Sequence, residues 1–135
     1  METEETRYLT YVEAVVIHID LMESVNEVRF GVFDRDLIES ALARPRQAAV
    51  YENADILRQA ATLCFGLIKS HPWTGGNKRT ATALTFIFLR LNGWRLYATM
   101  DERIELVLGI EAGRYDIDNI ETWLRQHARS ETPLS

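Results

Sequence analysis

The chain has 135 residues, of which 47% are hydrophobic and 26% are charged, as expected for one globular domain large enough to bury a core. Its formal net charge of −5 argues against general nucleic-acid binding, which relies on clustered lysine and arginine. No apolar run reaches the ~18 residues of a membrane span, and Met1–Glu5 is acidic where a signal peptide is basic. The single cysteine, Cys64, cannot form an internal disulfide, which favours a reducing cytoplasm. From the cysteine, the net charge and the lack of a long apolar run together, we expect a cytoplasmic protein with neither a nucleic-acid nor a membrane partner.

The first two predicted helices are marked by their N-caps. Thr10-x-x-Glu13 is a capping box, which predicts a helix beginning at the next residue. Asp34 can cap a second helix, which we expect to end before Pro45. The apolar face expected for the first helix consists of Val12, Val15, Val16, Ile19 and Met22.

The third and fourth helices flank the most polar turn of the chain. Asn53 or Asp55 opens the third helix. Asn77 can cap the fourth, which Asn92-Gly93 ends in the manner of a left-handed cap. Side chains of this fourth helix are apolar nearly all round, a pattern typical of a helix buried in the centre of its domain.

Two further helices follow a short extended piece at Trp94–Tyr97. Thr99-x-x-Glu102 begins a fifth helix, and Asp118-x-x-Glu121 begins a sixth.

The whole pattern predicts a mainly α-helical protein, a single compact bundle of about six helices around a central buried helix. We expect residues 1–135 to form one domain, with frayed ends at 1–8 and 130–135.

The segment 71–80, with the sequence HPWTGGNKRT, carries the strongest functional signal. Its two glycines allow a ligand close to the backbone, and the first N–H groups of the next helix lie at its positive end. Lys78 supplies a point charge and Arg79 a planar fork for phosphate oxygens. His71 is the candidate catalytic base, because an imidazole can take a proton from an attacking hydroxyl. The candidate phosphate-binding residues are Gly75, Gly76, Asn77, Lys78 and Arg79.

A simpler interpretation stands beside this one. A Gly-Gly-Asn run between helices is commonly only a connection, and a lone histidine is more often structural than catalytic. His18, near the apolar face of the first helix, is better explained as a structural histidine. The co-occurrence of histidine, glycines and two cations in one turn favours a phosphate site, to which Lys69 and Arg90 could add charge. The three histidines do not have metal-ligand spacing.

The segment resembles the signature of the Fic/Doc family, and specifically of its Doc (death-on-curing) branch, which reads His-x-aromatic-x-acid-small-Asn-Lys-Arg. The matching residues here are His71, Trp73, Gly76, Asn77, Lys78 and Arg79. Asp36–Pro45 is similar to the LLESALARP stretch of Doc-like chains, and Phe88–Gly93 to the end of the helix after their motif. The order and spacing of elements agree from about Tyr11 to Trp123, which is most of the chain.

This resemblance implies a Fic/Doc-like fold and the toxin of a bacterial toxin–antitoxin pair. Such a toxin transfers part of a nucleoside triphosphate, ATP, to a hydroxyl on a protein. The implied partners are a cognate antitoxin protein and a protein substrate such as translation elongation factor Tu, which Doc proteins phosphorylate. Fic proteins usually transfer AMP, and Lys78 in place of their second glycine favours phosphoryl transfer.

One departure from the family falls at Gly75, where the resemblance implies an acidic residue that holds Mg²⁺. Mg²⁺ is therefore a possible cofactor whose usual carboxylate is absent, and its ligands are unknown from the sequence. Asp34, Asp36 and Glu39 are the acids that could replace it if the fold brings one of them to the turn. The alternative function is a catalytically impaired nucleotide- or partner-binding module.

Overall fold

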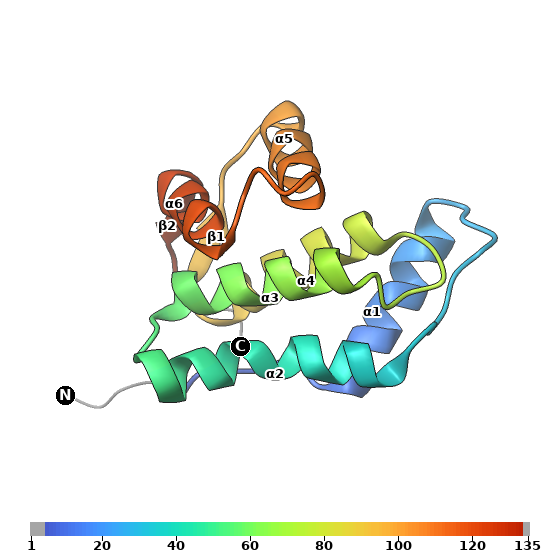
Figure 1. Cartoon of the computed structure of the whole chain (residues 1–135), viewed down its shortest axis with the longest axis horizontal. Helices are drawn as coiled ribbons and strands as arrows, with labels where there is room; N and C mark the ends of the chain where they lie inside the picture. Colours follow the sequence, from blue (N-terminus) through green and yellow to red (C-terminus); the bar gives the residue numbers. More distant parts are fainter. Residues whose placement is uncertain (1–4, 134–135) are drawn as a thin grey trace.

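A computed structural model describes residues 5–133 (Figure 1). The described residues form a mainly helical fold with one small sheet, which confirms the predicted fold class. The helices are α1 (Tyr11–Ser24), α2 (Arg35–Glu52), α3 (Ile56–Ser70), α4 (Asn77–Leu91), α5 (Met100–Glu111) and α6 (Ile117–His127). The strands are β1 (Trp94–Leu96) and β2 (Ala128–Ser130). None of these helices has the length and apolar character needed to cross a bilayer.

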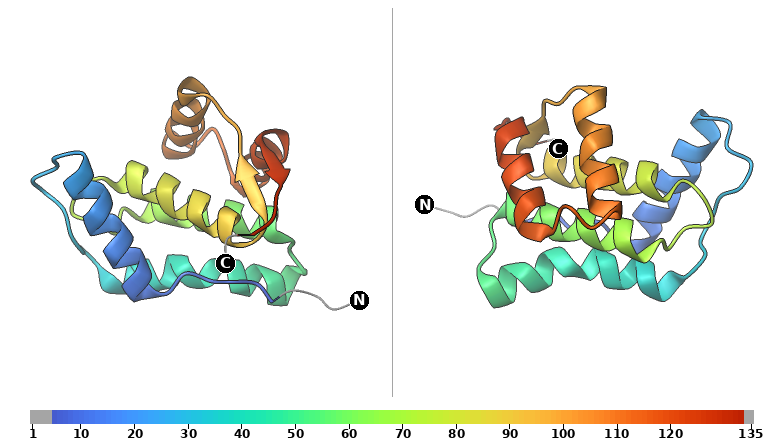
Figure 2. Two further views of the ribbon diagram at one scale, coloured as in Figure 1. Left: turned by 180° about the vertical axis from the view of Figure 1, so that it is seen from behind. Right: turned by 45° about the horizontal axis from the view of Figure 1, so that its top comes forward.

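The central helix is α3, whereas the sequence pointed to the helix that begins at Asn77. α3 packs against α2, α4, α5 and α6, and α2 lies on one side of the α3–α4 pair with α5 and α6 on the other (Figure 2). Cys64 lies on the buried face of α3. Burial raises the pKa of this thiol to about 11, as expected of an unreactive core cysteine. α4 is less enclosed, because one of its sides faces a cleft.

The predicted N-caps are confirmed at four helices. The side chains of Thr10, Asp34, Asp55 and Thr99 each accept a hydrogen bond from the first turn of their helix. Asn53 instead ends α2 in the left-handed conformation. The start of α6 was predicted two residues too late, since its cap and capping box are formed by Asp116 and Asn119 rather than Asp118 and Glu121.

α2 does not end before Pro45 but continues through it to Glu52. A proline inside a helix loses one backbone hydrogen bond and costs about 3 kcal/mol. The ring of Pro45 is buried, and α2 packs along the length of α3, so tertiary packing offsets the local cost.

The inward face of α1 also differs from the predicted one. Ala14, His18 and Met22 are its buried residues, whereas Val12 and Val16 are exposed, at 68% and 50%. The polar ring of His18 can lie inside because both of its nitrogens are hydrogen-bonded there.

The two ends of the described chain are attached to the fold. β1 and β2 pair antiparallel, with Trp94 opposite Ser130. The hydroxyl of Tyr8 donates to Gln59 at 2.9 Å, and its ring stacks on Phe88. The expected fraying at 1–8 and 130–135 therefore does not extend to Tyr8 or Ser130, and residues 1–4 and 134–135 lie outside the described part.

Candidate functional site

The segment 71–76 forms a tight turn between α3 and α4. His71 ends α3 in the left-handed conformation, with φ at 48°, and Gly76 precedes α4 with φ at 66°. Gly76, and not Asn77, is therefore the N-cap of α4, and it provides no capping side chain. The first intrahelical bond runs from the Thr80 N–H to the Gly76 carbonyl, so the three preceding N–H groups have no intrahelical acceptor.

Asn77 fixes the shape of this turn from the first position of α4. The backbone N–H of Trp73 donates to Asn77 Oδ1 at 2.9 Å, and Asn77 Nδ2 donates to the Trp73 carbonyl at 3.0 Å. Both ends of the amide are used within the turn. Asn77 can thus offer a ligand its backbone N–H, while its side chain keeps the turn in place.

Trp73 packs inward and stacks on His18 with ring centroids 4.2 Å apart. The backbone N–H of Gly31 donates to His18 Nε2 at 2.9 Å, so the proton of the neutral ring is on Nδ1, which donates to Thr80 Oγ1 at 2.8 Å. Burial lowers the pKa of His18. This histidine is a structural part of the support beneath the turn.

The loop between α1 and α2 lies against the same turn. The Thr74 N–H donates to the Gly31 carbonyl at 2.9 Å, and the Phe33 N–H donates to the Pro72 carbonyl at 3.0 Å. A Cβ added at Gly75 would fall far inside contact distance of the carbonyl oxygen of Arg29. Position 75 is therefore closed to any side chain by the backbone of this loop.

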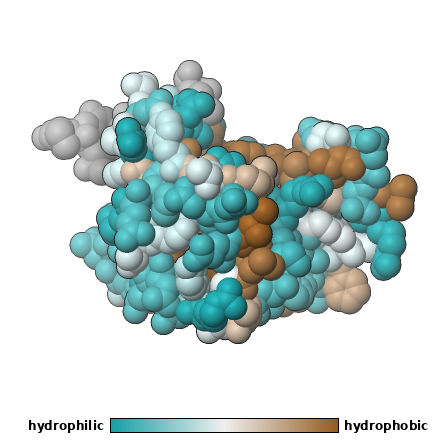
Figure 3. All heavy atoms as spheres, turned by 90° about the horizontal axis from the view of Figure 1, so that it is seen from above, coloured by the Kyte–Doolittle hydropathy of each residue, from teal (hydrophilic) through white to brown (hydrophobic). Residues whose placement is uncertain are grey.

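An open cleft of about 940 Å³ lies beside the turn, between α4, α5 and the end of α1. All the candidate residues except Gly75 line it, namely His71, Gly76, Asn77, Lys78 and Arg79. In the view onto the face where α5 lies, hydrophobic residues gather along a hollow between two hydrophilic masses (Figure 3). The cleft thus combines a cationic end at the turn with apolar walls, including Phe86 and Ile104.

Two charged residues of α5 complete this cleft, and the sequence did not identify them. Both carboxylate oxygens of Glu111 lie 3.3 Å from Lys78 Nζ, and one lies 3.7 Å from His71 Nε2. The guanidinium of Arg103 lies over the Phe86 ring, 4.6 Å from its centroid, with Nε buried and unpaired. Arg103 and Glu111 lie four residues before and four residues after Val107, so the sequence places all three on one face of a helix. The spacing does not tell which part of the fold that face contacts.

Other charged candidates lie elsewhere. Arg90 is at the far end of α4, where it donates to the Thr132 carbonyl at 3.2 Å, and Lys69 does not line the cleft. Asp34, Asp36 and Glu39 do not line it either, and Asp34 caps α2. The carboxylates lining the cleft are Glu27 and Glu111. Within residues 5–133, no set of three or more His, Cys, Asp or Glu residues could hold a metal by itself.

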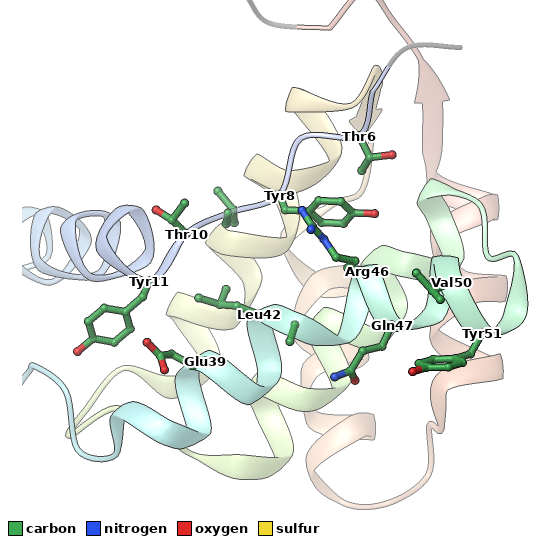
Figure 4. A pocket seen from close by; sticks show the side chains of 12 residues that line it. Thr6, Tyr8, Thr10, Tyr11, Glu39, Leu42, Arg46, Gln47, Val50 and Tyr51 are labelled. Carbon is green, nitrogen blue, oxygen red and sulfur yellow. The ribbon is translucent and has the colours of Figure 1, made fainter.

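A second groove, of about 610 Å³, lies between the N-terminal segment and α2 (Figure 4). Its cation, Arg46, lies over the ring of Tyr8 at 4.8 Å, and its carboxylate, Glu39, pairs with Arg35. This groove does not include the turn or a histidine. The chemistry-bearing residues therefore converge on the α4–α5 cleft.

The turn can hold an anionic ligand next to His71, a side chain that can accept a proton. Unbonded N–H groups, the positive end of α4, Lys78 and Arg79 can stabilise phosphate oxygens. The His71 side chain is 54% exposed, so a hydroxyl can reach it from the cleft.

Comparison with known proteins agrees with this geometry. Residues 8–89 match the model of the Fic/DOC family. The chain is 40% identical over 106 residues to a protein named Toxin Doc from Mycolicibacterium smegmatis, a match that covers 72% of this chain and 81% of that protein. It is 27% identical over 97 residues to Protein kinase doc of Escherichia phage P1, covering 71% and 76% of the two chains. With more than half of its length matched and the motif residues gathered at one cleft, the chain belongs to the Fic/DOC family.

Proposed function

We propose that this protein is a Doc-like toxin of a bacterial toxin–antitoxin pair, which transfers the terminal phosphoryl group of ATP to a hydroxyl of a protein. The observation that supports the proposal is the convergence of His71, Lys78 and Arg79 on one cleft at the N-terminus of α4. Relatives named as a toxin and a protein kinase point to the same activity. The proposed partners are an antitoxin and, as protein substrate, translation elongation factor Tu, which places the reaction in the cytoplasm.

In the proposed reaction, the substrate hydroxyl oxygen attacks the terminal phosphorus of ATP. Its proton passes to His71, the new P–O bond forms, and the bond to the bridging oxygen breaks to release ADP. Lys78, Arg79 and the first N–H groups of α4 offset the phosphate charge, so most of the catalysis comes from positioning and electrostatics. His71 would contribute the ~10²–10⁴-fold expected of a general base.

The second candidate is a nucleotide- or partner-binding module with impaired transfer. The observation in its favour is Gly75, because the loop backbone at Arg29 excludes the acid that the family places there. A module of this kind would keep the phosphate-binding turn and lose the chemistry.

Label transfer separates the candidates. We expect radiolabel from γ-labelled ATP, and not from α-labelled ATP, to appear on purified elongation factor Tu incubated with the protein. Label from the α-phosphate would establish nucleotidyl transfer instead. ATP binding without transfer from either label, to this factor or to a total lysate, would favour the binding module.

Arg79→Ala tests the phosphate site directly. We expect it to weaken ATP binding by about 1.5–3 kcal/mol, the range for hydrogen bonds to charged groups, as measured by isothermal titration. Arg90→Ala is the matched control, because it removes the same charge from the far end of the same helix. Equal ATP affinities in these two variants would remove Arg79 from the site.

A further inference from the structure

The acid that is missing at position 75 cannot be restored at that position in this fold. The backbone of the α1–α2 loop occupies the space that a side chain would need, with the Arg29 carbonyl oxygen directly against it. Any carboxylate that serves the phosphates must therefore come from another element.

Glu111, the last residue of α5, is placed to be that carboxylate. It contacts Lys78 through both oxygens at 3.3 Å and His71 at 3.7 Å, whereas the other acid of the cleft, Glu27, has no such contact with the turn's side chains. The Glu111 side chain is 35% exposed and lines the cleft from the last position of α5, so it can change partners without unfolding its helix.

We propose that Glu111 takes the role of the absent motif acid and binds the Mg²⁺ that accompanies the nucleotide phosphates. The inference rests on the proposed function, since it requires a triphosphate at the turn. Lys78 can bind either the Glu111 carboxylate or phosphate oxygens. When the phosphates bind Lys78, Glu111 loses its counter-ion beside a second anion, which is repulsive unless a cation binds between them.

The available donors fit the metal. Mg²⁺ prefers hard oxygen ligands and is commonly held in nucleotide sites by one or two carboxylates together with phosphate oxygens and water. One carboxylate at the turn therefore suffices, and the absence of a larger acidic cluster among residues 5–133 is no obstacle. The same carboxylate keeps Lys78 and His71 together before the nucleotide binds.

The test measures the effect of Mg²⁺ on ATP affinity by isothermal titration in the parent, Glu111→Gln and Glu105→Gln. Glu105→Gln is the matched control, because it removes the same charge from the same helix. Glu105 lies outside the cleft, where it accepts a hydrogen bond from the hydroxyl of Tyr115. We expect Mg²⁺ to tighten ATP binding about tenfold in the parent and the control, a typical coupling between ligands. In Glu111→Gln the gain should fall to about twofold or less, with metal-free ATP bound at least as tightly as by the parent.

Binding of Mn²⁺ in the presence of ATP, followed by electron paramagnetic resonance, gives a second readout that does not depend on transfer. We expect weaker Mn²⁺ binding only in Glu111→Gln. An unchanged Mg²⁺ gain in Glu111→Gln would overturn the inference and leave the proposed function standing. Tighter ATP binding by Glu111→Gln than by the parent, to the same extent with and without Mg²⁺, would also overturn it. Glu111 would then only compete with the phosphates for Lys78. No ATP binding by the parent under either condition would overturn the proposed function itself.

Discussion

His71 combines two roles at one residue, as the end of α3 and as the candidate base. Its left-handed backbone turns the chain away from α3 and directs the imidazole towards Lys78 and Glu111. A non-glycine residue with positive φ is uncommon and is found mostly where surrounding structure requires it. The conformation ends α3 and leaves the imidazole exposed on the side of the turn that faces the cleft.

His71→Asn separates the base from the backbone, because asparagine adopts the left-handed region more readily than most residues. We expect transfer to fall by about 10²–10⁴-fold, while ATP affinity and melting temperature stay close to those of the parent. Single-turnover transfer and titration calorimetry on the same preparations measure the two effects. Parallel losses of affinity and rate would instead show that His71 only shapes the turn.

Gly75 is required for packing and not for an unusual backbone angle, since Gly76 is the glycine of this pair with positive φ. Gly75→Ala should destabilise the fold by about 1–3 kcal/mol, the usual cost of overpacking, because its Cβ meets the Arg29 carbonyl. Thr74→Ala, at an exposed neighbour, should stay within about 0.5 kcal/mol of the parent in urea unfolding. Equal stability of the two variants would show that the loop moves away without cost.

At the scale of elements, His18 connects α1, the α1–α2 loop and α4. The ring accepts from the loop at Gly31 and donates to Thr80 of α4, so it is bound as the neutral form. Burial lowers its pKa below the ordinary value of 6.5. The unfolded chain therefore binds a proton near pH 6 that the folded chain does not bind.

The sign of the resulting pH dependence follows directly. The stability due to neutral His18 is fully present above pH 6.5 and is lost as the pH falls below that value towards the lowered pKa. We expect the free energy of unfolding of the parent to decline between pH 7.5 and 5.5 by up to about 1.4 kcal/mol per unit of pH. In His18→Gln this decline should be smaller, although the variant is less stable throughout. The same slope in both proteins would assign the decline to other groups.

The elements that the sequence predicted well are those whose signals are local. A cap at Thr10 or Thr99 depends on residues three positions apart, and both were confirmed. Pro45 was misjudged because packing against α3 outweighs its local cost. Glu111 and the closed space at Gly75 could not be found from sequence, since each depends on a contact between segments far apart in the chain.

At the scale of the whole molecule, the cleft lies beside a rigid pair of helices. α3 and α4 pack along one another, and the turn between them carries the candidate base and cations. α1 and α5 contribute the surrounding walls, with Met22 from one and Glu111 from the other. The protein's net charge of −5 makes this local group of cations a distinct feature of its surface.

Because the turn joins two packed helices, the stability of their interface also determines when the structure of the candidate site is lost on unfolding. His71 closes α3 and Gly76 opens α4, so their spacing cannot change unless the interface between these helices opens. That interface is the core of the fold, and its opening is global unfolding. Local fluctuations at the end of α5 can displace Glu111 while the candidate turn between α3 and α4 persists. On heating, the turn should therefore lose its structure only when the whole protein unfolds. The walls of the cleft should loosen gradually at lower temperatures.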